Sequence, residues 1–288
     1  MVLVPSSILI TGANRGVGLG ILKQWLLYPE VKHIFACVRK PSEESSHHLV
    51  LTVFVLVPWT CVRAYAHTRV HVVARFQELS ELAKADPRIH CIQLDVNADR
   101  SISDAVKKVR TTLGDGVGLN LLINNAGIKI SDGSLLNGAD RSVYLQHFDT
   151  NVVSVAKVIE GFYDLLKLAS ENSVSKEWGV HRAAIINISS SLGSLTLNTG
   201  GTKYVKNIPY GLSKAALNQL TKTLSADFEP DEILVISICP GRCRTDLGGS
   251  DAENTVEDST KKLVETSLTL HKEHSGAFIR NTGEILPF

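Results

Sequence analysis

The chain of 288 residues has little of several features that would place it quickly in a class of protein. It contains only 5 cysteines, too few in a chain of this length to indicate a disulfide framework, so free thiols in a reducing compartment are expected. Cys239 and Cys243 lie close together, but no further residues complete a metal-ligand pattern around them. The histidines show no mutual ligand spacing either, and we therefore expect no metal site.

Charge of one sign is also lacking, because the formal net charge is only +1. Proteins that hold nucleic acid or a membrane surface through their overall field carry a large basic excess, so neither partner is expected. The first ten residues contain no basic region, and a glycine-rich motif follows them at once. We therefore expect a cytoplasmic protein without a secretory signal.

Long hydrophobic runs are missing as well. Residues 49–57 are apolar except for one threonine, but a membrane-spanning helix needs about 20 such residues, so stable insertion is not expected. This run belongs to residues 42–75, which look like an atypical insertion, because one helix over residues 77–85 would be enough between the flanking strands. An extra hairpin, a membrane-surface segment and a segment foreign to the parent fold, such as a retained non-coding stretch, are the three interpretations.

Apolar runs alternate with helical patterns along the rest of the chain, without an internal repeat. Continuous apolar runs predict strands over residues 7–10, 32–38, 89–94, 119–123, 182–189, 233–239 and 277–280. Apolar residues on one helical face predict helices over residues 17–28, 77–85, 152–168 and 210–228. Because such strands are typical of a parallel sheet covered on both faces, we predict an α/β fold. Residues 1–288 would form a single doubly wound Rossmann domain with a mostly parallel seven-stranded sheet.

A glycine-rich sequence follows the first expected strand. Gly12, Gly16 and Gly18 have the spacing Gly-x3-Gly-x-Gly, and a helix is expected directly after them. The glycines permit a tight turn and a close approach of the backbone to a pyrophosphate, while the helix N-terminus adds N–H groups and a partial positive charge. We predict a dinucleotide site here. Its other predicted contacts are Asn14, Arg15 and Val17.

Two arginines favour NADPH over NADH as the cofactor. In NADH sites an acidic residue near the end of the second strand holds the ribose 2′-hydroxyl, but residues 37–40 contain no acid. Arg39 ends that strand and Arg15 lies within the glycine loop, and the forked guanidinium group suits a 2′-phosphate. The alternative interpretation is that both arginines face solvent.

Two more strand ends complete the expected cofactor crevice. The third expected strand leads into an aspartate, whose carboxylate can accept a hydrogen bond from the adenine amino group. The fourth ends in Asn-Asn-Ala-Gly, where small residues let the backbone lie against a cofactor and the asparagine amides can tie neighbouring strands together. Because the carboxyl ends of parallel strands meet at one edge, these sites outline a single crevice. The residues predicted there are Asp95, Val96, Asn125, Ala126 and Gly127.

Tyr210 and Lys214 stand four residues apart, so on a helix their side chains lie on one face. A lysine ammonium beside a phenol favours the phenolate, which would move the tyrosine pKa from about 10 towards working pH. Such a tyrosine can give or take a proton while a hydride moves. Three consecutive serines, residues 189–191, lie upstream of this pair.

In this order, the motifs Thr-Gly-x3-Gly-x-Gly, Asn-Asn-Ala-Gly, an upstream serine and Tyr-x-x-x-Lys resemble the short-chain dehydrogenase/reductase family. Residues 179–190, 239–249 and 283–287 also look like the sniffer-type carbonyl reductases of that family. The resemblance covers nearly the whole chain except the insertion. It implies a Rossmann fold, NADPH as cofactor and the reduction of a ketone, an aldehyde or a quinone of modest size.

The catalytic tetrad of the family falls on Asn151, Ser190, Tyr210 and Lys214, with Ser189 as the alternative if the register slips by one. The resemblance implies that Ser190 fixes the substrate carbonyl and that Tyr210 donates the proton as hydride arrives. It also implies that Lys214 lowers the tyrosine pKa and holds the nicotinamide ribose. Asn151 would bind a water that leads protons to Lys214.

The resemblance extends to the segment that meets the nicotinamide carboxamide in relatives, which falls on Pro240, Gly241 and Thr245. Arg242 departs from it, because many close relatives carry a tryptophan there, so substrate preference is not expected to transfer. Related proteins often pair through the helices that carry the tetrad asparagine and tyrosine. Little room for a blocking insertion lies between the tetrad serine and tyrosine, so a homodimer is a further expectation.

Two other functions fit parts of the pattern. A non-catalytic NADPH-binding redox sensor would need the cofactor site, although it need not keep a Tyr-Lys pair, and the intact tetrad argues against it. A membrane-associated lipid or retinoid reductase would use residues 49–57 as an interfacial patch. Both remain alternatives to the NADPH-dependent carbonyl reductase.

Overall fold

The computed structural model describes residues 3–39, 77–130, 140–203 and 207–288. The predicted insertion at residues 42–75 lies outside the described residues, and so do the three interpretations of it. Within the described ranges, no helix has the length and apolar content needed to cross a membrane.

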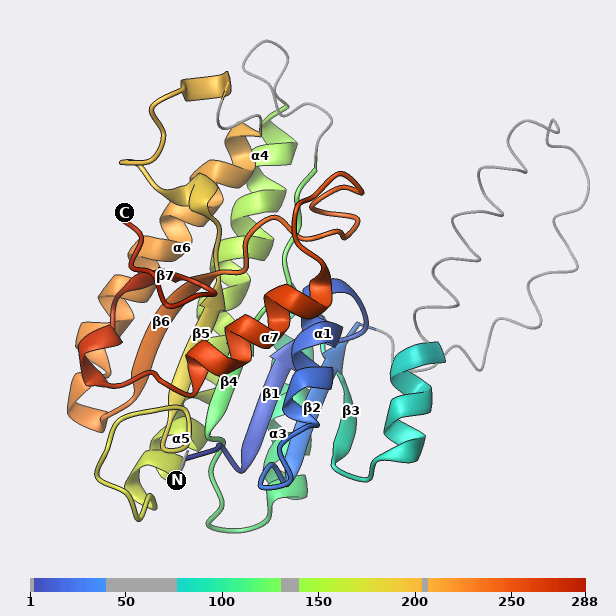
Figure 1. Ribbon diagram of the computed structural model, residues 1–288. Coiled ribbons are helices and arrows are strands. Elements are labelled where there is room, and N and C mark those ends of the chain that lie inside the picture. The colour runs from blue at the N-terminus through green and yellow to red at the C-terminus, as the bar shows by residue number, and fades with distance from the viewer. Residues whose placement is uncertain (1–2, 40–76, 131–139, 204–206) are drawn as a thin grey trace, which may run out of the picture.

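Seven strands form one sheet at the centre of the molecule (Figure 1). Their order across the sheet is β3-β2-β1-β4-β5-β6-β7, and every neighbouring pair is parallel. The predicted doubly wound fold is therefore confirmed. The strands are β1 (Ser7–Thr11), β2 (His33–Val38), β3 (Ile89–Gln93), β4 (Leu121–Asn124), β5 (Ala184–Ile188), β6 (Leu234–Cys239) and β7 (Phe278–Arg280).

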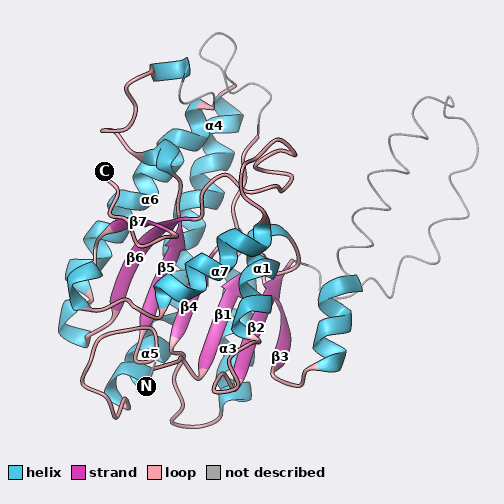
Figure 2. Cartoon of the chain, in the orientation of Figure 1, coloured by secondary structure: helices cyan, strands magenta, loops and turns pink. Residues whose placement is uncertain are grey.

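Helices connect the strands and cover the sheet (Figure 2). They are α1 (Gly16–Trp25), α3 (Asp99–Leu113), α4 (Arg141–Phe148), the π-helical turn η1 (Asp149–Val153), α5 (Ser154–Glu171), α6 (Ile208–Asp227) and α7 (Val256–Ser267). Residues 77–85 are also helical, as expected between β2 and β3. Short 3₁₀ turns are η2 (Ser191–Gly193), η3 (Gly201–Lys203), η4 (Glu229–Asp231) and η5 (Lys272–His274).

Both faces of the sheet are buried, because successive strand side chains point to opposite sides and helices cover each side. In β1, Ile8 and Ile10 pack into a core with α1 and α7, whereas Leu9 packs into a second core with α3 and α5. Figure 1 shows α1 and α7 on the near face of the sheet. Covering on both sides explains why the central strands appear in the sequence as continuous apolar runs.

Three helices were not predicted from the sequence. α3 buries Ile102, Ala105, Val109 and Leu113 at helical spacing, but its other residues are mostly polar, so the apolar stripe is narrow. α4 and α7 begin at N-caps whose side chains accept backbone hydrogen bonds. The Asp140 carboxylate accepts from Ser142 N at 2.8 Å, and the Thr255 hydroxyl accepts from Asp258 N at 3.0 Å.

The sheet has a topological switch point between its two halves. β1 pairs with β2 on one side and with β4 on the other, so the connections that leave β1 and β4 run in opposite directions across the sheet. Connections that diverge in this way leave a crevice at the carboxyl ends of the strands, where ligands bind in open α/β sheets. The fold therefore positions the predicted motifs around one crevice.

Candidate active site

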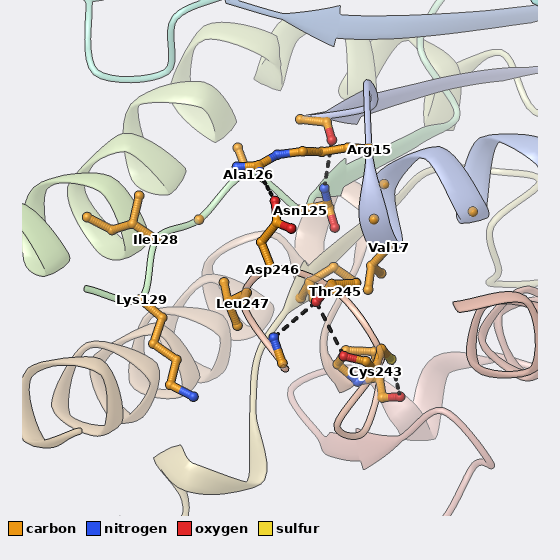
Figure 3. Close-up of a pocket in the computed structure, with 18 of the residues that line it drawn as sticks. Arg15, Val17, Asn125, Ala126, Ile128, Lys129, Cys243, Thr245, Asp246 and Leu247 are labelled. Atoms are coloured by element: carbon orange, nitrogen blue, oxygen red, sulfur yellow. Dashed lines mark hydrogen bonds and ion pairs between the residues drawn. The ribbon is translucent and has the colours of Figure 1, made fainter. Parts of the chain in front are cut away.

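A cleft of about 1700 Å³ opens at the carboxyl ends of the central strands (Figure 3). Its size exceeds the typical upper limit of about 1,000 Å³ for a small-molecule pocket, so it has room for a dinucleotide and a substrate together. Most of the residues predicted from the sequence line it. They are Gly12, Asn14, Arg15, Gly16, Val17, Gly18, Arg39, Val96, Asn125, Ala126, Gly127, Ser190, Tyr210, Lys214, Pro240, Gly241 and Thr245.

The glycines shape the turn between β1 and α1. Gly12 and Gly16 have positive φ angles of 67° and 53°, a region that glycine enters without steric cost. A Cβ added to Gly18 would lie 2.4 Å from the Gly12 carbonyl oxygen and 2.5 Å from Asn125 Nδ2. The helix thus starts directly against the strand turn, with its N-terminal N–H groups at the cleft. These residues fit a dinucleotide phosphate.

Hydrogen bonds tie the ends of β1 and β4 together. The Thr11 hydroxyl oxygen accepts from the backbone N–H groups of Asn125 and Ala126, both at 2.9 Å. The Asn125 amide donates in return to the Thr11 carbonyl oxygen at 2.8 Å. One strand further along, the Asn124 amide donates to Asn187 Oδ1 at 2.9 Å. The Asn-Asn-Ala-Gly motif therefore joins three neighbouring strands at the floor of the cleft.

The two arginines of the predicted cofactor site both line the cleft, but in different settings. The Arg15 guanidinium forms an ion pair with Asp246, which follows β6 (Figure 3). Both side chains are about half exposed, at 52% and 47%. Arg39 is exposed at the end of β2. Sequence reasoning missed Asp246, because the acid that meets Arg15 is distant in the chain.

Asp95 does not lie among the residues that line the cleft, although Val96 and Asn97 do. Its carboxylate accepts a hydrogen bond from Asn97 N at 3.1 Å, and its own N–H donates to the Ser101 hydroxyl at 2.9 Å. In this structure Asp95 holds the turn between β3 and α3. Contact between Asp95 and an adenine amino group therefore stays a prediction.

Tyr210 and Lys214 lie in the first turns of α6, and both are buried, with 7% and 6% of their surface exposed. The N-cap Asn207 starts this helix by accepting a hydrogen bond from Tyr210 N at 3.0 Å. The Lys214 ammonium lies 5.7 Å from the centre of the Tyr210 ring and donates to the Ile188 carbonyl oxygen at 2.8 Å. The helix therefore places the pair on one face, as expected.

Burial dominates the electrostatics of this pair. It raises the pKa of Tyr210, the neighbouring Cys239 acts in the same direction, and a hydrogen bond with Ser190 opposes them. Burial also lowers the pKa of Lys214 to about 8. The expected net lowering of the tyrosine pKa is therefore wrong for this arrangement, because removal from water is the largest effect on the phenol. A raised pKa keeps the phenol protonated near neutral pH.

The structure separates the two candidate serines. The Ser190 hydroxyl lies in the cleft within hydrogen-bonding reach of Tyr210, and it accepts from Leu192 N at 3.2 Å. The Ser189 hydroxyl donates to Asn218 Oδ1 at 2.6 Å, and Ser189 is only 2% exposed. The geometry thus favours Ser190 as the serine that meets a ligand beside Tyr210.

Asn151 is fully buried in the π-helical turn η1 and stands behind the cleft wall. Its amide donates to the Ile128 carbonyl oxygen and to the Ser213 hydroxyl, both at 3.0 Å, and Oδ1 accepts from Ile128 N at 2.9 Å. Asn151 thus joins the segment after β4 to α6. Single π-helical turns often occur at functional sites. The predicted water beside Asn151 stays a prediction.

Sequence reasoning missed Lys129, which lines the cleft close to the predicted catalytic residues. Its ammonium lies 5.8 Å from the centre of the Tyr210 ring, and burial followed by the charge of Arg242 lowers its pKa. The signal that could have found it is its place two residues after the Asn-Asn-Ala-Gly motif. Residues just beyond the carboxyl end of a parallel strand border the ligand crevice.

Comparison with known proteins identifies the family. Residues 60–255 match the sequence profile described as short chain dehydrogenase. The chain belongs to this family of oxidoreductases. The short-chain dehydrogenase is also 27% identical over 296 residues to an uncharacterised oxidoreductase of Schizosaccharomyces pombe, a match that covers 97% of this chain and 96% of the relative. It is 27% identical over 287 residues to a short-chain dehydrogenase of Penicillium roqueforti, with 98% and 96% covered.

Solved structures of carbonyl reductases resemble this short-chain dehydrogenase closely. The carbonyl reductase Sniffer of Drosophila melanogaster has a TM-score of 0.83 and 32% sequence identity, and the match covers 99% of this chain and 100% of that one. An NADPH-bound carbonyl reductase from chicken fatty liver has a TM-score of 0.84 and 30% identity, with 99% and 95% covered. The predicted resemblance to sniffer-type enzymes is therefore confirmed.

The two serines supply a paired test of the site. We expect Ser190→Ala to lower kcat/KM for a carbonyl substrate about 100-fold without a change in unfolding temperature, because only a cleft-facing hydroxyl is lost. Ser189→Ala leaves Asn218 Oδ1 unpaired in the interior, so we expect it to lower the free energy of unfolding by about 1–3 kcal/mol. Steady-state kinetics and denaturant titration of both variants check this assignment. The reverse pattern would contradict it.

Proposed function

We propose that this short-chain dehydrogenase reduces the carbonyl group of a ketone, an aldehyde or a quinone with NADPH. The observation that carries the proposal is the buried Tyr210 phenol, hydrogen-bonded to Ser190 at the cleft and accompanied by Lys214. A protonated phenol beside a second hydroxyl donor suits a carbonyl oxygen, which gains electron density and a proton during reduction. The two similar carbonyl reductase structures support the same reaction.

NADPH is the proposed cofactor, and when bound it supplies the hydride. The glycine turn and the N-terminus of α1 would hold its pyrophosphate. Arg15 and Arg39 line the same cleft, where their guanidinium groups would hold the 2′-phosphate. The Arg15 guanidinium would bind the phosphate and Asp246 at the same time. The chicken carbonyl reductase with bound NADPH lends support, since its similarity extends over nearly the whole chain.

The residues of the chain would divide the remaining work. Ser190 would hold the substrate carbonyl oxygen at a fixed angle, and Tyr210 would give that oxygen its proton. Lys214 would return a proton to the Tyr210 phenolate oxygen and hold the nicotinamide ribose. Asn151 would position the segment after β4 and hold the predicted water. The raised pKa of Tyr210 keeps the phenol in its protonated form, which is the form that can donate to the carbonyl oxygen.

A Tyr210→Phe variant tests the proton donor. We expect it to lose reductase activity by about 100-fold or more, because the phenyl ring has no proton to give. It should still bind NADPH, measured by fluorescence titration, since the ring and the cofactor residues remain. The assay is NADPH oxidation by purified protein against a panel of quinones, aldehydes and ketones.

Tyr163→Phe is the matched control for this variant, because its hydroxyl bonds to Asp231 away from the cleft. Turnover should be unchanged in the control. Near-full turnover in Tyr210→Phe would remove the proton-donor assignment. Loss of activity in both variants would point to a general effect of removing a hydroxyl.

The pH dependence of the rate should follow Lys214. Its pKa is lowered to about 8, so the ammonium is present below that pH and is lost as the pH rises through it. We therefore expect kcat/KM for reduction to fall as the pH rises through about 8, because proton return to Tyr210 weakens. Unfolding temperatures at the same pH values serve as the control. A rate that stays constant well above pH 8 would contradict the role of Lys214.

An Arg39→Asp variant tests the cofactor preference. The carboxylate would repel a 2′-phosphate and accept from a 2′-hydroxyl, so the ratio of kcat/KM for NADPH over NADH should fall by about 100-fold. Arg100→Asp, on α3 outside the cleft and with 96% of its side chain exposed, is the matched control. An unchanged ratio in Arg39→Asp would refute the 2′-phosphate argument.

A further inference from the structure

Lys129 stands at the part of the cleft where the proposed chemistry takes place. It follows β4, is half-buried, and extends from the cleft wall shown in Figure 3. Its ammonium lies 5.8 Å from the centre of the Tyr210 ring, about the same as the 5.7 Å between Lys214 and that ring. A ligand held by Tyr210 would therefore have Lys129 as a close neighbour.

The backbone on both sides of Lys129 is held by buried side chains. Asn151 accepts from the N–H of Ile128 and donates to its carbonyl oxygen. His147 Nε2 accepts from Ile130 N at 3.1 Å, and the Asn207 amide donates to the Ile130 carbonyl oxygen at 2.6 Å. Four hydrogen bonds thus fix the segment, and a lysine on such a segment loses less freedom when it binds a ligand.

The positive charge of Lys129 has no counter-charge nearby in the described structure. Across residues 3–39, 77–130, 140–203 and 207–288, no hydrogen bond or ion pair of its ammonium occurs. Arg242 is close enough to repel it, and the Arg242 guanidinium is itself held by Asp251 at 2.5 Å and by the Gly248 carbonyl oxygen at 2.9 Å. Arg15 pairs with Asp246. Lys129 is therefore a cation beside Tyr210 that an incoming anion would neutralise.

Apolar side chains complete this end of the cleft. Leu192, on the turn η2, lines the cleft, and so does Leu247, which lies on the loop after β6 (Figure 3). They add apolar surface to the cleft that also holds Tyr210 and Lys129, which suits a substrate with a hydrocarbon skeleton. A lysine in a partly desolvated site attracts a carboxylate more strongly than it would in water.

We infer that Lys129 selects carbonyl substrates that also carry a carboxylate, so the preferred substrate class is an oxo acid or an aldehyde acid of modest size. This inference rests on the proposed carbonyl reduction. The carbonyl carbon gains a hydride and its oxygen gains the Tyr210 proton, while the carboxylate stays unreacted as an anchor. The product is the corresponding hydroxy acid.

Matched substrates test the inference. We would measure kcat/KM for levulinate and its methyl ester, and for para-carboxybenzaldehyde and its methyl ester, because each pair differs mainly in the negative charge. The wild-type protein should prefer the acid in each pair. Lys129→Met keeps the length of the side chain without the charge, and we expect it to lower the acid-to-ester ratio by about tenfold, mainly through KM. Lys129→Arg should retain the preference.

Lys107→Met is the control, because this lysine lies on α3 outside the cleft with 73% of its side chain exposed. It should leave the ratio unchanged. If wild type reduces the esters as well as the acids, and Lys129→Met does not change the ratio, the inference is wrong while the proposed function stands. If no carbonyl compound of the panel is turned over although NADPH binds, the proposed function fails and the inference fails with it.

Discussion

The hydrogen bonds between Thr11 and the Asn125–Ala126 backbone are the interaction on which the rest of the site depends. They join β1 to β4 at the switch point of the sheet, where the two strands diverge into different connections. The same junction sets the glycine turn, since Gly18 packs directly on the Gly12 carbonyl and the Asn125 amide. The glycine turn and the segment after β4 are therefore parts of one hydrogen-bonded unit. Leaving buried hydrogen bonds of this kind unmade costs free energy of folding.

A second set of buried hydrogen bonds connects this unit to α6, the helix that carries Tyr210 and Lys214. Asn151 bonds to Ile128 after β4 and to Ser213 on α6, one residue before Lys214. The helix in turn buries Tyr210 and Lys214 together, which raises one pKa and lowers the other. Burial moves the proton affinities of the two groups apart, because a phenol and an ammonium group have similar pKa values of about 10 in water. Lys214 therefore gives up its proton more readily than in water and Tyr210 holds its proton more tightly, so a proton passes downhill from Lys214 to a Tyr210 phenolate.

The sheet could be predicted because the central strands are buried on both faces and appear as continuous apolar runs, whereas the edge strand β3 also carries polar and exposed residues. The prediction of the helices was less complete. α3 carries only a narrow apolar stripe. α4 and α7 begin at the N-caps Asp140 and Thr255, and a single capping residue is a weak indication of a helix in the sequence. A helix that is mostly polar in sequence forms because the sheet supplies the apolar surface that its stripe covers.

By itself, the sequence determined the parallel sheet, the glycine turn, the Tyr-Lys spacing and the family, because these follow from local periodicity and short motifs. Only the tertiary structure decided that Ser190 faces the cleft while Ser189 bonds to Asn218, and that Asp246 reaches Arg15. It also decided that burial raises the pKa of Tyr210 and that Lys129 stands beside its ring. These outcomes depend on which distant residues meet and on how much water the fold excludes, and a linear pattern specifies neither.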